Sequence, residues 1–179
     1  RNVILQVEKS DAHPGEVVLQ VDDLVVLDDR KASVVNGVSL EVRAGEVLGI
    51  AGVQGNGQRE LVEALTGMRP IVSGRFVIEG KDATRYTPRQ ITNLDVAHIP
   101  EDREKHGLVM AYPIEDNTVL NQYYERPYSH NSVIDRRAIR SHADALVEEF
   151  DVRTSSVTAP ASNLSGGNKQ KLIVAREFS

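Results

Sequence analysis

The sequence predicts an α/β fold, and three observations support that prediction. An apolar run at 47–51 comes directly before a glycine-rich segment at 52–57, and a helical apolar pattern follows it. A second pair of glycines, at 166–167, likewise opens a helical pattern near the end of the chain. Between these two segments, a strand-helix-strand order favours a parallel sheet.

Short strands are predicted in the N-terminal part of the chain, where apolar residues alternate with polar ones or form short runs between turn residues. These strands cover 17–21, 38–42, 46–51, 74–80 and 95–99. The uninterrupted apolar run at 47–51 predicts that the strand at 46–51 is buried. The polar residues at 28–31 predict a turn between the first two strands.

Capping residues mark the helices of the same region. A helix that begins near Arg59 is predicted to end at Gly67, because glycine commonly follows the last helical residue. A second helix is predicted to begin after Thr87. Threonine is a favoured cap, Pro88 suits the first helical position, and Gln90 completes a capping box.

Two more helices are predicted in the second half of the chain. Asp135 is expected to cap an amphipathic helix whose apolar stripe consists of Ile139, Ala143, Leu146, Val147 and Phe150. The polar stretch 154–163, broken by Pro160, predicts a loop. The last helix follows Ser165 and has the apolar positions Leu172, Ile173, Ala175 and Phe178. Lys169 and Lys171 are expected to lie on its solvated face.

The composition fits one domain and excludes several function classes. A chain of 179 residues can bury an ordinary core. Its formal charge of −5 and its pI near 5.6 argue against non-specific binding to nucleic acid, which needs a basic surface. Cysteine is absent, which fits a reducing compartment. No apolar run approaches the ~18–20 residues that span a bilayer, so we expect a soluble chain that reaches a membrane only through a partner.

Both glycine segments have the chemistry of an anion-binding site. Ser165 is a preferred helix cap, and the glycines at 166–167 let a foreign group approach the backbone closely. The free N–H groups of the first helical turn and the positive end of the helix dipole attract a phosphate, to which the serine adds a hydroxyl. Taken alone, the serine is more simply an ordinary cap. The segment 52–57 has the strand-turn-helix layout of a loop that surrounds a phosphate with backbone N–H groups.

Together the two segments resemble the phosphate loop and the signature motif of an ATP-binding-cassette (ABC) nucleotide-binding domain. They begin 112 positions apart, at 52 and 164, which leaves no room for the long coiled coil of a chromosome-maintenance ATPase head. The segment 97–109 further resembles the second cassette of bacterial simple-sugar and nucleoside importer ATPases, which carry two cassettes in one polypeptide. The similarity runs from about Val18 to Ser179 and favours the nucleoside branch.

The resemblance implies a P-loop NTPase fold of the ABC type, with an antiparallel β subdomain and a helical subdomain. It divides the chain into a β-rich core with the phosphate loop at 1–100, a helical subdomain at 101–163, and the signature motif with its helix at 164–179. In an ABC domain the next strand carries a magnesium-binding aspartate and the catalytic glutamate. The chain therefore reads as truncated after the signature helix, and we expect it to be inactive by itself.

The resemblance also assigns binding residues and partners. The loop residues that would bind ATP and Mg²⁺ are Gly52, Val53, Gln54, Gly55, Asn56, Gly57, Gln58, Arg59 and Glu60. The signature residues, which would contact ATP held by the partner cassette, are Leu164, Ser165, Gly166, Gly167 and Asn168. The implied partners are the first cassette of the same polypeptide, transmembrane permease subunits and, indirectly, an extracytoplasmic solute-binding protein, with no nucleic acid. The implied role is a peripheral subunit on the cytoplasmic face of the bacterial inner membrane, coupling ATP hydrolysis to uptake of nucleosides or simple sugars.

The phosphate loop departs from the family's pattern at two positions. A working loop ends in Gly-Lys-Ser/Thr, where the lysine contacts the β- and γ-phosphates and the hydroxyl binds magnesium. Here the two positions hold Gln58, which is neutral, and Arg59, which has no hydroxyl. Loss of one charged hydrogen bond costs roughly 1.5–3 kcal/mol, so we expect weak nucleotide binding, partly offset if Arg59 supplies positive charge. An alternative function is a non-catalytic nucleotide-binding regulatory module.

Glu101 stands where ABC domains carry a glutamine that contacts magnesium and the attacking water. A carboxylate can also bind magnesium, and the alternative for this residue is a surface turn with Asp102 and Arg103. The histidines show no paired ligand spacing, so no further metal site is predicted. The tyrosines at 112, 123, 124 and 128 are either packing residues or a docking surface for the permease.

Overall fold

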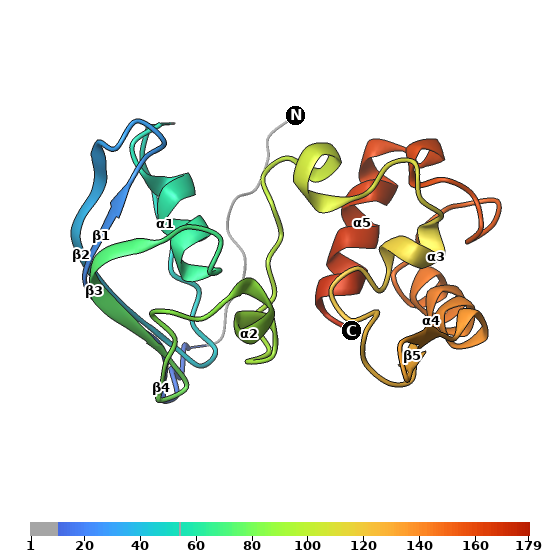
Figure 1. Ribbon diagram of the computed structural model, residues 1–179, viewed down its shortest axis with the longest axis horizontal. Helices are drawn as coiled ribbons and strands as arrows, with labels where there is room; N and C mark the ends of the chain where they lie inside the picture. The colour runs from blue at the N-terminus through green and yellow to red at the C-terminus, as the bar shows by residue number, and fades with distance from the viewer. Residues whose placement is uncertain (1–10, 54) are drawn as a thin grey trace. The chain divides into compact units, whose positions relative to one another are not determined.

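The computed structural model describes residues 11–53 and 55–179, which divide into two compact units (Figure 1). The first unit ends at Asp95, and the second unit is Val96–Ser179. Within these described ranges, no helix is long and apolar enough to cross a membrane.

The first unit is built on a four-stranded antiparallel sheet with the strand order β2-β1-β3-β4. Its strands are β1 (Val17–Leu27), β2 (Ser33–Arg43), β3 (Ile71–Ile78) and β4 (Lys81–Asp82). The strands predicted at 17–21 and 38–42 are confirmed as parts of longer strands. The strand predicted at 74–80 is confirmed as β3, which begins and ends slightly earlier.

The turn between β1 and β2 is confirmed at 28–31. The Asp28 carboxylate accepts the backbone N–H groups of Arg30 and Ala32 at 2.9 and 2.8 Å. A short side chain that bonds the backbone two residues ahead is a standard way to fix a turn.

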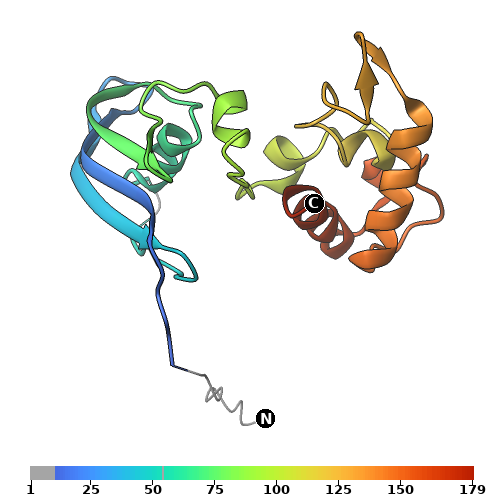
Figure 2. The same ribbon diagram turned by 90° about the horizontal axis from the view of Figure 1, so that it is seen from below.

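Two helices complete the described part of this unit. The helix α1 (Gln58–Leu65) lies against β1 and β2 on one face of the sheet (Figure 2). It ends where Gly67 adopts a φ of 73°, as the sequence predicts. The helix α2 (Pro88–Thr92) begins after Thr87, and both hydrogen bonds of its capping box are present. The buried side chains of the sheet and of α1 are Val21, Leu24, Val26, Val35, Phe76, Ile78, Leu61 and Ala64.

The predicted parallel sheet is wrong for the described residues, in which every strand pair is antiparallel. Residues 46–53 and 95–99 form no strand. The predicted burial of 46–51 is also wrong, because Val47 is 95% exposed and Ile50 is 53% exposed. A strand that is buried on both faces needs neighbouring strands and covering layers, and no described strand pairs with this run. An uninterrupted apolar run thus indicates a segment that is suited to burial, but it does not determine which strands pair with that segment.

The second unit is mainly helical. Its elements are η1 (Arg103–Gly107), α3 (Ile114–Asn117), α4 (Arg136–Glu149), η2 (Ala161–Asn163), α5 (Gly166–Glu177) and a hairpin of β5 (Ser129–His130) with β6 (Val133–Ile134). The predicted amphipathic helix is confirmed as α4. Asp135 caps it by accepting the N–H groups of Arg137 and Ala138 at 2.9 and 3.1 Å. The predicted loop at 154–163 contains η2 as its last turn.

An aliphatic core joins α5 to the neighbouring segments of this unit. Its members are Leu108, Ile114, Val152, Ala161, Leu164, Leu172 and Ile173. Phe178 was expected on the apolar face of the last helix, and that expectation is wrong. The helix ends at Glu177, so Phe178 becomes the C-terminal cap and is 70% exposed.

Asn117 is fully buried, and its side chain bonds only to backbone groups. Its Oδ1 atom accepts the N–H of Val109 at 2.8 Å. Its Nδ2 atom lies 3.1, 3.3 and 3.0 Å from three carbonyl oxygens, those of Val109, Tyr112 and Pro113. This one amide therefore fixes the path of the chain between η1 and α3.

The tyrosines of the second unit fall into two groups. Tyr128 is buried in a small cluster with Val119 and Ile139, so it is a packing residue. Tyr112 and Tyr123 are about half exposed, and Tyr124 is partly buried with its ring edge-on against Tyr123, so the docking alternative stays a prediction for these three.

A partly buried histidine predicts a pH-dependent stability for this unit. The His142 ring lies against Tyr128 with ring centroids 5.1 Å apart, and its Nε2 atom is buried without a hydrogen-bond partner. Burial lowers the pKa of His142, so the unfolded chain takes up a proton before the folded chain does. Stability is therefore fully present above the unfolded pKa of about 6.5 and is lost as the pH falls below it.

Urea unfolding between pH 5.5 and 7.5 would measure this dependence. We expect the wild-type chain to be less stable at pH 5.5 than at pH 7.5. In His142→Leu, which has no group to protonate at this position, the free energy of unfolding should depend less steeply on pH. Burial also lowers the pKa of His98, so part of the slope should remain in that variant. An unchanged slope in His142→Leu would show that His142 does not cause it.

Candidate functional site

The glycine-rich loop leads directly into α1. Gly55 and Gly57 have φ values of 90° and 95°, which L side chains rarely adopt. A Cβ atom at Gly57 would also collide with the carbonyl group of Val34. These two glycines are therefore required by the backbone path. Gln54, which the sequence assigns to this loop, lies outside the described residues.

The Gln58 side chain folds back over the start of the loop. A Cβ atom at Gly52 would collide with the carboxamide nitrogen of Gln58, so Gly52 is needed to let this side chain lie there. The position that should hold the phosphate-binding lysine thus places a neutral amide against the loop. This amide can form a hydrogen bond with a phosphate but cannot balance its charge.

Arg59 is surrounded by carboxylates. Its guanidinium lies 3.8 Å from Asp29, 3.5 Å from Glu60 and 3.3 Å from Glu63. Arg69 competes for the same acids, at 2.9 Å from Asp29 and 2.7 Å from Glu63. The charge that Arg59 was expected to offer a phosphate is therefore shared among three acidic side chains.

The loop residues fit a phosphate better than they fit magnesium. The N-terminus of α1 presents backbone N–H groups, and Gly57 supplies no side-chain cap that would block them. Magnesium prefers oxygen ligands. Arg59 has no oxygen in its side chain, and the Glu60 carboxylate is paired with Arg59. Among the described residues, no group of three or more His, Asp or Glu side chains is placed to hold a metal.

The predicted signature motif forms the start of α5. Leu164 is buried, and Ser165 caps the helix by accepting the N–H of Asn168 at 3.4 Å. The Ser165 Oγ atom also accepts the Asn168 Nδ2 group at 3.0 Å. Both bonds use oxygen lone pairs, so the hydroxyl hydrogen is available to an acceptor outside the protein. Ser165 is an ordinary cap and a potential donor at once.

Gly166 and Gly167 differ in their surroundings. A Cβ atom at Gly167 would meet nothing within 4 Å, whereas one at Gly166 would lie 3.1 Å from the Arg103 guanidinium. Arg103 therefore lies directly beside the first turn of α5. The sequence placed Arg103 only in a surface turn, and no local pattern relates it to a glycine so far along the chain.

Lys169 was expected on a solvated face, and that expectation is wrong. Lys169 is 8% exposed, and its Nζ atom lies 2.7 Å from the Glu104 carboxylate. Lys171 is partly exposed and pairs with Asp151 at 2.7 Å. This contact lowers the pKa of Asp151, first through the hydrogen bond and then through the charge of Lys171.

Glu101 is exposed in the bend before η1. Asp102 caps η1 by accepting the N–H groups of Glu104 and Lys105, each at 3.0 Å. These backbone hydrogen bonds lower the pKa of Asp102. The local geometry is that of a surface turn, and a role of Glu101 toward magnesium stays a prediction.

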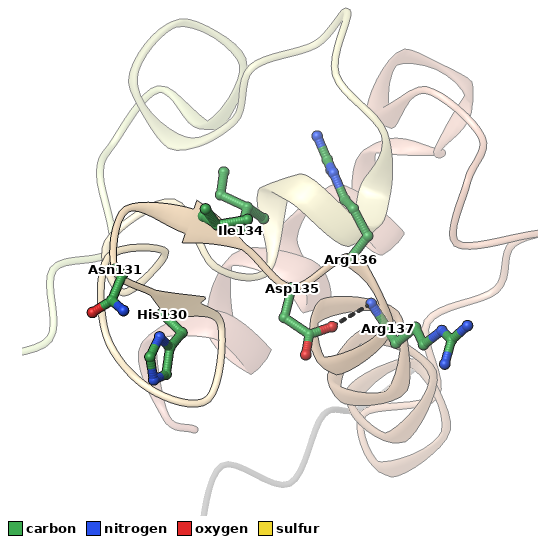
Figure 3. Close-up of a pocket in the computed structure, with 7 residues that line it drawn as sticks. His130, Asn131, Ile134, Asp135, Arg136 and Arg137 are labelled. Atoms are coloured by element: carbon green, nitrogen blue, oxygen red, sulfur yellow. Dashed lines mark hydrogen bonds between the residues drawn. The ribbon is translucent and has the colours of Figure 1, made fainter.

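A separate open hollow of about 620 Å³ lies beside the β5–β6 hairpin (Figure 3). Its lining residues are His130, Asn131, Val133, Ile134, Asp135, Arg136 and Arg137. Figure 3 shows the Asp135 carboxylate bonded to the backbone of Arg137, and Arg136 pairs with Asp116. None of the predicted site residues lines this hollow, and two of its charged groups already have structural partners.

Comparisons with known proteins agree on one family. The ABC transporter family matches residues 35–179. A guanosine import ATP-binding protein from Bacillus subtilis (strain 168) is 47% identical over 178 residues, which are 99% of this chain and 35% of that protein. A glucose import ATP-binding protein from Haloferax volcanii is 41% identical over 181 residues, covering 100% of this chain and 33% of that protein. This chain thus spans about a third of the length of these relatives.

Solved structures show the same fold. A nucleotide-free ATP-binding cassette from an ABC transporter has a TM-score of 0.72 and 20% identity, over 90% of this chain and 64% of that one. A structure of the ADP conformation of an ATP-binding cassette of an ABC transporter has a TM-score of 0.68 and 20% identity, over 90% of this chain and 64% of that one. The ABC-type fold inferred from the two glycine segments is confirmed.

Proposed function

Because this chain belongs to the ABC transporter family, we propose that it is the second nucleotide-binding cassette of an importer ATPase. In this proposal the cassette couples binding and hydrolysis of ATP to uptake of a nucleoside. The first cassette of the same polypeptide, a transmembrane permease and, indirectly, a solute-binding protein are its partners. The complex would place the cassette at the cytoplasmic face of the membrane.

The observation that carries the proposal is the contrast between the two phosphate-binding segments. Ser165 has a free hydroxyl hydrogen at the start of α5, so the signature can donate to a phosphate oxygen. The loop has a neutral Gln58 against Gly52 and an Arg59 shared among carboxylates. We propose that the signature completes a working site on the first cassette, while the loop forms a degenerate site that binds nucleotide weakly.

The chemistry proposed for the signature is electrostatic. ATP held by the first cassette would bring its γ-phosphate to the first turn of α5, where backbone N–H groups and the Ser165 hydroxyl stabilise negative charge. Gly166 and Gly167 would let the phosphate approach the backbone. Magnesium, when bound, would neutralise the phosphate oxygens from the first cassette's side, because the loop of this chain lacks the hydroxyl that binds it.

A non-catalytic regulatory module is the second candidate. The sharing of the Arg59 charge among three carboxylates favours it at the loop. Both candidates expect weak nucleotide binding by this chain, and neither expects ATP hydrolysis by the 179-residue chain alone. They differ at the signature, which only an importer cassette needs to keep intact.

Uptake of labelled solutes tests the proposed substrate class. The relatives named for guanosine and nucleoside import are 47% identical to this chain, whereas two named for ribose import are 35% and 37% identical. We expect cells that lack the gene to lose uptake of guanosine while ribose and glucose uptake stay unchanged. Re-introduction of the full-length gene should restore guanosine uptake. Loss of ribose uptake alone would contradict the nucleoside assignment.

A further inference from the structure

The last turn of α5 carries a buried ion pair between two adjacent residues. The Arg176 Nε atom lies 2.9 Å from the Glu177 carboxylate, and the two side chains are 7% and 8% exposed. Adjacent helical residues normally face in different directions. Here both side chains turn toward the same neighbour, the segment 98–107.

Each member of the pair holds a different end of that segment. The second carboxylate oxygen of Glu177 accepts the backbone N–H of His98 at 2.9 Å. The Arg176 Nη1 group donates to the carbonyl oxygen of Gly107 at 2.8 Å. A buried ion pair is costly unless its hydrogen bonds are completed, and these two backbone groups complete them.

The middle of the same segment is held at the other end of α5. The Glu104 carboxylate pairs with Lys169 at 2.7 Å, and Arg103 lies beside Gly166. The segment thus leaves the last turn of α5 at residue 98, reaches the first turns at 103–104 and returns at residue 107. Figure 1 shows η1 beside the end of α5 that is far from the C-terminus.

Close packing fixes the returning part of the segment. A Cβ atom at Gly107 would lie only 2.5 Å from the Ile173 Cδ1 atom. Interiors packed this closely transmit a displacement and do not absorb it. The attachments at Lys169 and Glu177 are about 12 Å apart along the helix axis, at 1.5 Å per residue. Two attachments that far apart resist both sliding and rotation of the segment against the helix.

We infer that Arg176 and Glu177 are positioning residues that hold the segment 98–107 and the signature helix as one rigid body. A displacement of Glu101 and η1 then moves Ser165 and Gly166, although residues 102–164 separate Glu101 from Ser165 along the chain. The coupling follows from the contacts of this unit alone. Its bearing on ATP hydrolysis rests on the proposed function.

Nuclear magnetic resonance of the 179-residue chain without nucleotide tests the coupling. Glu177→Gln keeps the shape of the side chain but removes its charge, and Arg176→Lys keeps the charge but cannot reach both partners. The His98 amide should exchange with solvent at least about tenfold faster in each variant, because it loses a charge-assisted hydrogen bond or its support. The backbone resonances of residues 166–168 should also shift. Phe178→Ala, at the same helix end but 70% exposed, should change neither.

A purely structural role would give a different result. General destabilisation speeds exchange at many sites without moving the native resonances of residues 166–168. Changes confined to His98 and the last turn of α5 would therefore overturn the inference. A change at 166–168 supports it even if the importer proposal fails, because no nucleotide is present.

A double-mutant cycle gives a second test that depends on stability alone. Glu177→Gln and Glu104→Gln act on opposite ends of α5 and share no contact, so independent sites would give additive losses. We expect clear non-additivity, because both act on the same segment. Additive losses would overturn the inference. If Glu177→Gln does not fold, the cycle uses Arg176→Lys in its place.

Discussion

Replacing Gly166 by Asp in the full-length protein should lower ATP hydrolysis by the proposed importer by more than about 100-fold, the usual loss when phosphate or oxyanion stabilisation is removed. The new side chain would stand where, in the proposed site, a phosphate approaches the first turn of α5. Its carboxylate would repel the phosphate and would pair with the Arg103 guanidinium, which lies 3.1 Å from the added Cβ position. ATPase activity of the full-length protein, assembled with its proposed permease partners, measures the effect.

The same substitution should leave the fold intact. A carboxylate in the first turn of a helix is favoured by about 0.3–1 kcal/mol through the helix dipole, and Arg103 offers it a partner. The melting temperature of the variant should therefore equal or slightly exceed that of the wild type. Gly166→Ala adds the Cβ atom without the charge, and its activity should lie between those of the wild type and Gly166→Asp.

Gln58→Ala is the matched variant for the other site and should be far milder. Gln58 belongs to the loop that already lacks the lysine and the hydroxyl. If Gln58→Ala reduced hydrolysis more than Gly166→Asp, the assignment of the working site to the signature would be reversed. Equal and mild effects of both variants would favour the regulatory module.

Restoring the loop should raise nucleotide affinity of the isolated chain by about 10- to 100-fold, the factor given by one charged hydrogen bond. The double variant Gln58→Lys with Arg59→Ser supplies one phosphate cation and one magnesium-binding hydroxyl. Calorimetry should show tighter ATP binding that depends on magnesium. The wild-type chain should show weak binding, with a dissociation constant on the order of 0.1 mM or higher, and no turnover.

The two single variants separate the two effects. Gln58→Lys alone should raise affinity without magnesium dependence. Arg59→Ser alone should bring little gain in nucleotide affinity. Glu63 and Asp29 stay paired with Arg69 in that variant. Unchanged affinity in the double variant would mean that the loop does not adopt a phosphate-binding conformation in this chain.

Local features of the fold were predicted well from the sequence. The caps at Thr87, Asp135 and Ser165 are confirmed because each depends on bonds within three residues of the cap. The strand predicted at 46–51 failed for the opposite reason. A strand forms only with a partner strand, and the residues of an apolar run do not indicate which segment pairs with it.

The contacts around the signature helix could not be predicted for the same reason. The local sequence pattern predicts a solvated Lys169, because its partner Glu104 lies far away in the sequence. The pair formed by Arg176 and Glu177 has no spacing that distinguishes it from an exposed pair of charges. Such contacts depend on the tertiary path of 98–107, which the sequence pattern does not specify.

The hydrogen bonds of Asn117 have a consequence for sequence divergence among related chains. Its amide contacts only main-chain atoms between Val109 and Pro113. The side chains of that stretch can therefore change in evolution without loss of a single one of these bonds. Position 117 itself has no such freedom, since aspartate lacks the donor and leucine lacks both donor and acceptor. An amide kept at position 117 would thus hold this main chain in place while the exposed side chains of Val109 and Tyr112 are free to change.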